Sequence, residues 1–170
     1  LWKQLMDKVC TMLVDYLKMQ VAAGAQALQL FDSWVGCLSP SDYEKYILPY
    51  SKRVFDCLKD VGVPVINFST GTSTMLDLVQ KAGGDVLSFD WRIEIDSART
   101  ILGNNQPVQG NLDPVTLFAP LPVIQDRVHD ILKRAGKRGH IFNLGHGILQ
   151  HTPVEHVKAV VDMVHEYKYE

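Results

Sequence analysis

Five short apolar runs, each followed by a polar or glycine-rich loop and then a helical segment, constrain the fold of this chain most. The runs span residues 26–31, 64–68, 85–89, 107–110 and 141–144. Near-continuous apolar runs are typical of strands that are covered on both faces of a parallel sheet. No hairpin signal lies between any two of them, so each strand has to return through a helix. The pattern predicts an α/β fold of five strand–loop–helix repeats that follow a first helix at residues 2–23.

The helices are marked by boundary signals in the sequence. SPSD at residues 39–42 predicts a helix start, with a serine N-cap, proline at the first helical position and an acid in the first turn. We expect this helix to run to about residue 61 and to be kinked or split at Pro49. TPVE at residues 152–155 has the residues of a capping box and predicts the start of the last helix. The other helices are expected at residues 74–82, 95–102 and 122–135.

The loops favour a (β/α)8 barrel over a doubly wound sheet. Each strand is followed by a polar or glycine-rich loop at its carboxyl end, where the active sites of barrels lie, and no GxGxxG loop follows any strand. Five units cannot close a barrel of eight, and an open sheet would leave two unpaired edges. The chain also starts with Leu1 directly in a helix. We therefore expect residues 1–170 to be the C-terminal part of a single barrel domain, with three units outside this sequence.

Composition excludes several classes of function. The hydrophobic content of 46% and the charged content of 21% are ordinary for a globular protein, and the net charge of −2 gives no electrostatic case for nucleic acid or an anionic membrane. No apolar run approaches the roughly 20 residues that span a bilayer. Cys10, Cys37 and Cys57 lie far apart, without the spacing of a zinc site, and their odd number favours reduced thiols.

Two strand ends offer the best candidates for chemistry. His146 stands between two glycines just after a strand, so its imidazole is unshielded by neighbouring side chains. Imidazole is the side chain most often used for acid–base chemistry near neutral pH. Ser33 follows another strand but has no adjacent base and no GxSxG elbow, which favours hydrogen bonding over nucleophilic catalysis. For His146 the alternative is a tight turn with an incidental polar residue. For the loop of Ser33 the alternative is purely structural, with Asp32 capping the following backbone and Trp34 filling a gap. Asp90 could serve either structure or function, whereas Asp113 before a proline favours a turn and cap.

Taken together, the strand ends resemble one family. The order FDSWVG (31–36), FSTGTS (68–73), DW (90–91), QGNLDP (109–114) and FNLGHGI (142–148) is similar to the C-terminal half of the uroporphyrinogen decarboxylase family. The stretches AAGAQALQLFDSWVG and FNLGHGI…TPVEHV carry the closest resemblance. It extends over residues 21–164, and five ordered strand ends are far more specific than a single GHG.

The resemblance implies a fold, a reaction and a setting. The family is a single (β/α)8 barrel that acts as a homodimer in tetrapyrrole (heme) biosynthesis. It removes carbon dioxide from the four acetate arms of uroporphyrinogen III, giving coproporphyrinogen III without a metal or an organic cofactor. The resemblance implies that the protein lies in the cytoplasm, or in the plastid of a photosynthetic eukaryote. It implies no nucleic acid or membrane partner.

The resemblance also assigns site residues, position by position. Ser33 matches the family's hydroxyl that contacts the substrate, His146 matches the histidine that contacts a substrate carboxylate, and Phe31 would line the cleft wall beside Ser33. The family's substrate-binding arginines, its aspartate facing the pyrrole nitrogens and its cleft tyrosine have no matching positions here. No catalytic residue is therefore assigned in this segment, and residues 1–170 alone are predicted to be inactive.

Two other functions remain open. Zinc-dependent methyltransferases of the same superfamily, which act on corrinoids or thiols, hold their metal with a His-x-Cys pair at one strand end and a later cysteine. Here the corresponding loop reads NFSTG at residues 67–71, and His146 occupies the position of the later cysteine. The third possibility is a porphyrinogen-binding module that has lost catalysis.

Overall fold

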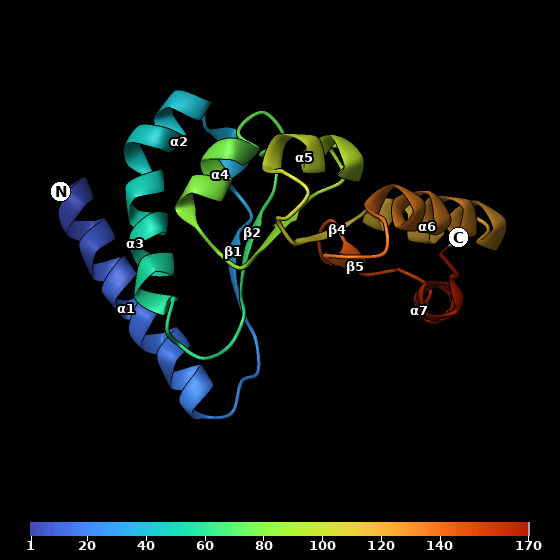
Figure 1. Cartoon of the computed structure of the whole chain (residues 1–170), viewed down its shortest axis with the longest axis horizontal. Coiled ribbons are helices and arrows are strands. Elements are labelled where there is room, and N and C mark those ends of the chain that lie inside the picture. Colours follow the sequence, from blue (N-terminus) through green and yellow to red (C-terminus); the bar gives the residue numbers. More distant parts are fainter. Residues whose placement is uncertain (170) are drawn as a thin grey trace. The chain divides into compact units, whose positions relative to one another are not determined.

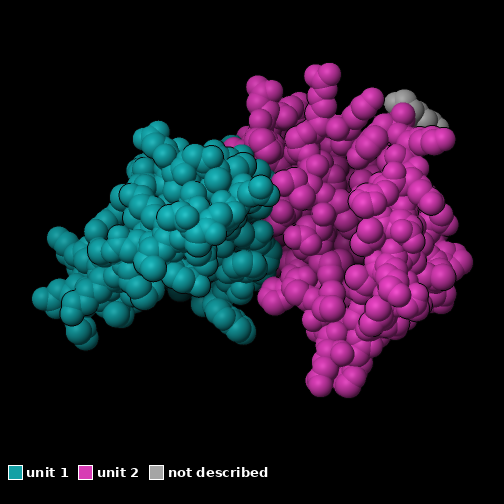
Figure 2. Space-filling view, turned by 90° about the horizontal axis from the view of Figure 1, so that it is seen from below, with its two compact units in different colours: residues 1–87 teal, residues 88–170 magenta. Residues whose placement is uncertain are grey.

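The computed structural model describes residues 1–169 and divides into two compact units, one formed by residues 1–87 and the other beginning at residue 88. Figure 1 traces the elements along the chain, and Figure 2 colours the two units. The helices are α1 (Trp2–Ala22), α2 (Pro40–Tyr46), α3 (Leu48–Leu58), α4 (Leu76–Ala82), α5 (Ile95–Leu102), α6 (Leu121–Ala135) and α7 (Val154–Glu166). The strands are β1 (Leu28–Asp32), β2 (Val65–Ser69), β3 (Val86–Phe89), β4 (Val108–Leu112) and β5 (His140–Leu144), and short 3-10 turns η1 (Val35–Cys37) and η2 (Pro114–Phe118) follow β1 and β4.

The first unit packs helices against a parallel pair of strands. β1 and β2 run parallel, with Leu28 opposite Val65. In Figure 1, α1 and α3 lie on one side of these strands, and buried residues from α1, α3, α4 and both strands form one hydrophobic cluster. Leu58 of α3, at 1% exposure, is among the most buried members of that cluster. Truncating a leucine buried to this degree to alanine costs about 2–5 kcal/mol of folding free energy.

The helix after β1 is split in two, as the sequence predicts. Ser39 caps α2, since its hydroxyl oxygen accepts a hydrogen bond from the Asp42 backbone N–H at 3.1 Å. Ile47 ends α2 and also precedes α3, whose first turn contains Pro49. Proline at this place lacks an N–H that the first turn would leave unpaired anyway. α3 ends at Leu58, three residues before the predicted end.

Helix α1 carries a second apolar face that nothing in its own unit covers. Cys10 and Leu17 are buried against the strands. Leu5, Met12 and Tyr16 lie on another side of the same helix and are each more than half exposed. Exposed apolar residues at helical spacing mark a surface that fits a further packed element.

The second unit repeats the same packing. β4 and β5 run parallel, with Leu112 opposite Leu144. Buried residues of β4, η2, α6 and α7 form its hydrophobic cluster, and the alternate residues Phe142 and Leu144 of β5 pack against it. Ile124 and Val128 of α6 are fully buried. One face of β5 is therefore directed toward the helices, while Ile141 on the other face is 46% exposed.

Arg99 and His140 bond to backbone carbonyls before β5 and in β4. The guanidinium of Arg99 donates to the carbonyls of Arg138 and Gly139 at 2.9 Å each. The His140 ring Nε2 lies 2.7 Å from the Gly110 carbonyl oxygen. Burial lowers the pKa of His140, opposed by that hydrogen bond. A neutral imidazole is therefore favoured at the start of this strand.

The five strands form one parallel sheet in the order β1-β2-β3-β4-β5. This confirms the predicted α/β fold, and the order is the one expected for five consecutive units of a (β/α)8 barrel. β2, β3 and β4 are buried along their whole length, whereas β1 and β5, which end the order, are only partly buried. The expectation of near-continuous burial therefore holds for the three inner strands and is wrong for the two outer ones, because each outer strand has a single neighbour.

Two further local predictions differ from the structure. The predicted capping box is wrong, because Pro153 is the N-cap of α7. Within residues 1–169, no side chain caps this helix and the buried Thr152 hydroxyl has no hydrogen-bond partner. β4 extends to Leu112, two residues beyond its predicted end, so Asn111 lies inside the strand.

Among residues 1–169, no helix is both long and apolar enough to cross a membrane.

Candidate functional site

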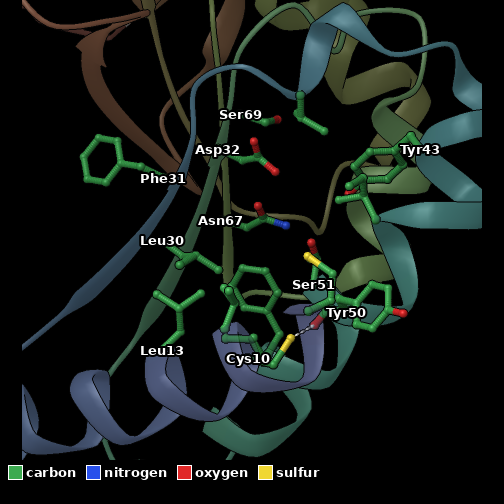
Figure 3. A pocket seen from close by; sticks show the side chains of 16 residues that line it. Cys10, Leu13, Leu30, Phe31, Asp32, Tyr43, Tyr50, Ser51, Asn67 and Ser69 are labelled. Carbon is green, nitrogen blue, oxygen red and sulfur yellow. Dashed lines mark hydrogen bonds between the residues drawn. The ribbon is translucent and has the colours of Figure 1, made fainter. Parts of the chain in front are cut away.

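Ser33 directly follows β1, whose last two side chains, Phe31 and Asp32, lie on opposite sides of the strand. Phe31 is 65% exposed and packs edge-on against Phe68 of β2, with ring centroids 5.2 Å apart. Figure 3 shows Asp32 directed to the other side of the strand, into a pocket beneath the helices. Phe31 thus presents an exposed apolar ring on the side of β1 opposite to Asp32. That this ring lines a substrate cleft stays a prediction from the resemblance.

The pocket beside Asp32 is small and lies under the helices rather than on the open sheet face. It has a volume of about 150 Å³ and is lined by residues of α1, α2, α3, β1 and β2 (Figure 3). Burial raises the pKa of Asp32, opposed by hydrogen bonds from the backbone N–H groups of Val35 and Trp34. Burial, followed by the negative charge of Asp32, raises the pKa of Tyr43 to about 12. These groups serve the interior of the first unit.

The loop after β2 is buried and internally bonded. The Ser69 and Thr72 hydroxyls lie 2.9 Å apart, and the Thr70 hydroxyl donates to the Ser33 carbonyl at 2.6 Å. The sequence marks this stretch only as a small-residue loop. Its link to Ser33 is not visible in the sequence, because 37 residues separate the two partners.

The position where the zinc enzymes keep ligands has a structural role here. The Asn67 side-chain amide donates to the carbonyls of Gly83 at 2.9 Å and Val79 at 3.3 Å, at the end of α4. A side chain at Gly84 would come within 2.9 Å of the Asn67 Cβ, and this glycine has φ +105°. Asn67 therefore ties strand to helix. Among residues 1–169, no three His, Cys, Asp or Glu side chains form a group that could hold a metal ion.

The loop after β3 contains a buried carboxylate with its own counter-ion. Asp90 is 2% exposed and forms an ion pair with the half-exposed Arg92, whose backbone N–H also donates to it at 3.1 Å. The Arg92 guanidinium stacks over the Trp91 ring at 4.6 Å. The Asn111 side-chain amide donates to the carbonyls of Asp90 and Ile93 at 3.0 and 2.7 Å. Asp90 therefore orders the loop and orients a guanidinium at its surface.

The loop after β5 presents His146 from a tightly packed base. Gly145 is buried, and a side chain there would lie 2.8 Å from the Trp91 backbone nitrogen and 3.0 Å from the Asp90 Cα. Only glycine allows so close an approach of the two loops. His146 itself is exposed. The result is an accessible imidazole on a loop that is packed against the loop of Arg92.

The site residues predicted from the sequence are divided between the two units. Ser33 and Phe31 belong to the first unit and His146 to the second, and Ser33 and His146 each follow the carboxyl end of a strand in the same parallel sheet. Asp113 is a cap, as expected, since its carboxylate accepts from the Val115 N–H at 2.9 Å. Thr70 and Asn111 are the contributors that sequence reasoning missed. The hydrogen-bond partners of Thr70 and Asn111 lie on other loops. The one sequence signal that could have indicated them is a polar residue at a strand end.

Comparison with known proteins identifies the relatives of this chain. The family model described as "Uroporphyrinogen decarboxylase (URO-D)" matches residues 1–167. A uroporphyrinogen decarboxylase of Carboxydothermus hydrogenoformans is 59% identical over 97% of this chain and 47% of its own length. One of Solibacter usitatus is 52% identical over 99% of this chain and 49% of its own length. The chain thus spans about half the length of these relatives.

A solved structure supports the fold alone. A methyltransferase from Methanosarcina mazei superposes with a TM-score of 0.82 at 20% identity, covering 94% of this chain and 48% of the other. At 20% sequence identity this structure indicates the fold but not the reaction. With the family match over nearly its whole length, the chain belongs to the uroporphyrinogen decarboxylase family.

Proposed function

We propose that residues 1–170 form the C-terminal part of a single (β/α)8 barrel domain whose intact protein decarboxylates uroporphyrinogen III to coproporphyrinogen III. The match to uroporphyrinogen decarboxylases at 59% identity over 97% of the chain carries this proposal. The five ordered strand-end loops support it. The same family match supports a homodimer in the cytoplasm, or in a plastid if the source is a photosynthetic eukaryote, without nucleic acid or membrane partners.

The proposed reaction needs no electron sink from outside the substrate. A pyrrole that is protonated on a ring carbon becomes a cation, and this cation accepts the electrons left when an acetate arm loses carbon dioxide. The protein then has to hold the macrocycle, stabilise the cation and deliver a proton. We assign no metal and no organic cofactor to it.

Three residues of this chain are proposed to contact the substrate. The Ser33 hydroxyl and the His146 imidazole donate hydrogen bonds to substrate carboxylates. Phe31 covers an apolar part of the macrocycle, an assignment that its exposed ring supports. Arg92 adds a positive charge near the loop of His146, because Gly145 packs on the backbone of Asp90 and Trp91.

The remaining groups come from outside this sequence. A substrate with eight carboxylates needs more cationic groups than the strand ends of this chain carry, and the family's arginines, aspartate and tyrosine have no counterparts here. The exposed apolar face of α1, and the place of β1 at one end of the strand order, support a preceding β/α unit as their partner.

Activity of a reconstituted barrel tests the proposal. The N-terminal half of the Carboxydothermus hydrogenoformans relative is joined to residues 1–170, giving what we call the fusion protein. Coproporphyrinogen formation from uroporphyrinogen III is then measured for the fusion protein and for residues 1–170 alone. We expect turnover by the fusion protein and none by the isolated chain.

Three results would contradict parts of this account. A folded fusion protein that binds uroporphyrinogen without turnover favours the non-catalytic binding module. Stoichiometric zinc in the purified fusion protein, together with methyl transfer, favours the methyltransferase. Turnover by residues 1–170 alone refutes the need for the outside groups.

A further inference from the structure

The peptide group that follows Ser33 is held at both ends by side chains. Its carbonyl, which belongs to Ser33, accepts a hydrogen bond from the Thr70 hydroxyl at 2.6 Å. Its N–H, which belongs to Trp34, donates to the Asp32 carboxylate. With both polar groups of one peptide bonded, rotation about the backbone bonds on either side of it is restricted. The direction of the Ser33 side chain is restricted with it.

The two side chains that hold this peptide are themselves anchored. Thr70 is only 9% exposed, and its backbone N–H donates to the Asp32 carbonyl at 3.4 Å. Asp32 is directed into the pocket beneath the helices, away from the side of Phe31 (Figure 3). Its carboxylate accepts a second N–H, from Val35. The Thr70 hydroxyl and the Asp32 carboxylate therefore both bond to the backbone of the loop after β1.

Glycine packing fixes the two loops against each other. A side chain on Gly36 would overlap with the Thr70 carbonyl oxygen and with Gly71. Gly71 has φ +69°, a conformation that favours glycine. The loop after β2 is therefore a support for the loop after β1, with the Thr70 hydroxyl at the point of contact.

We infer that Thr70 and Asp32 are positioning residues that set the direction of the Ser33 hydroxyl toward the substrate. The inference rests on the proposed function, because it needs Ser33 to bind substrate. Ser33 contacts the substrate directly, whereas Thr70 and Asp32 act only through the Ser33–Trp34 peptide. Removing either group raises KM, because a misdirected hydroxyl loses a hydrogen bond to a charged carboxylate.

A double-mutant cycle in the fusion protein tests the role of Thr70. Thr70→Val removes the donor and keeps the shape, and we expect KM to rise roughly tenfold. Thr70→Ser restores the hydroxyl and should restore KM. In a Ser33→Ala background, Thr70→Val should change KM little further, because the hydroxyl that it positions is already absent. Thr100→Val is the matched control, since the exposed Thr100 hydroxyl also donates to a backbone carbonyl, that of Asp96, at 3.0 Å.

The outcomes separate this inference from the proposed function. An inactive fusion protein contradicts the proposed function before any variant is made. With an active fusion protein, a Thr70→Val effect that is equally large in the Ser33→Ala background overturns the positioning role. So does a loss of kcat at unchanged KM, which signals a smaller folded fraction. Thermal unfolding of each variant measures that fraction directly.

Asp32 is tested by a graded pair of substitutions. Asp32→Asn keeps an oxygen that can accept the Trp34 N–H, and we expect KM within about threefold of the parent. Asp32→Ala removes the acceptor and should raise KM as Thr70→Val does. Equal KM values for Asp32→Ala and the parent overturn the assignment of Asp32.

Discussion

In the proposed function, the Ser33 hydroxyl and the His146 imidazole each donate one charge-assisted hydrogen bond to a substrate carboxylate. We predict that Ser33→Ala and His146→Ala each lower kcat/KM of the fusion protein by roughly tenfold to a hundredfold, the range expected when one such bond is lost. Steady-state coproporphyrinogen formation measures this. The exposed helix residues Ser97 and His165 provide matched alanine controls, which should leave kcat/KM unchanged. Parent-like kinetics for the Ser33 and His146 variants would remove both from the substrate site.

His140 predicts a pH dependence of stability. Burial lowers its folded-state pKa below the ordinary value of 6.5, so the folded state binds a proton less readily than the unfolded state. The stability that the neutral ring contributes is present above pH 6.5 and is lost as the pH falls from 6.5 through the folded pKa. We expect the urea concentration at the midpoint of unfolding to decrease as the pH is lowered from 7 to 5. The decrease should be smaller in His140→Gln. The same pH slope in both proteins would contradict this origin.

Single residues show where sequence reasoning reaches its limit. Ser33, Phe31 and His146 are predicted as site residues because their neighbours in sequence form recognisable loops, and this prediction is still to be tested. The role of Asn111 could not be predicted, because its partners Asp90 and Ile93 lie on another strand end. Local patterns report local contacts, whereas the bonds that order these loops join residues far apart in the chain.

The start of α2 allows an element-scale prediction. The Ser39 side chain accepts the Asp42 N–H and donates to the Asp42 carboxylate at 2.9 Å. Ser39→Ala should therefore lower the free energy of unfolding by about 1 kcal/mol, and Ser39→Asn should retain most of it. Chemical denaturation of the fusion protein measures both. An unchanged unfolding free energy in Ser39→Ala would mean that water replaces the cap fully.

Element types could be predicted well, and element ends less well. Pro49 correctly indicated a split, because its ring is incompatible with a helix interior. The TPVE motif failed as a capping box because Pro153 itself became the N-cap of α7, leaving Thr152 one residue too early. β4 continues for two residues past Gly110, where the sequence predicts its end, although glycine is uncommon inside a strand. In the structure a side chain at Gly110 would lie 2.8 Å from the Phe89 carbonyl oxygen, so the glycine permits a close approach within the strand.

At the scale of the whole molecule, the two strands that end the sheet are the surfaces open to association with another chain. β1 and β5 end the strand order and are only partly buried. We predict that residues 1–170 alone associate with increasing concentration through these edges. Ile141→Lys should weaken the association, because a charge on an edge strand opposes pairing. Ile101→Lys, at a similarly exposed position on α5, is the control. Sedimentation velocity measures both, and a chain that stays monomeric at all concentrations contradicts the prediction.

The fold class and strand order followed from the repeats alone, since parallel strands joined by helices leave few arrangements. The unequal burial of the strands depends on how many neighbours each one has, and no pattern within a strand reports that. The same holds for the second apolar face of α1, since a helical stripe does not reveal which of its sides is covered.

The most direct measurement is a crystal structure of the fusion protein with coproporphyrinogen bound. We predict that the Ser33 hydroxyl and the His146 imidazole both lie within hydrogen-bonding distance of the tetrapyrrole side chains, with the Phe31 ring against the macrocycle. A tetrapyrrole bound away from the carboxyl ends of the strands, or one in contact with neither Ser33 nor His146, would contradict the account.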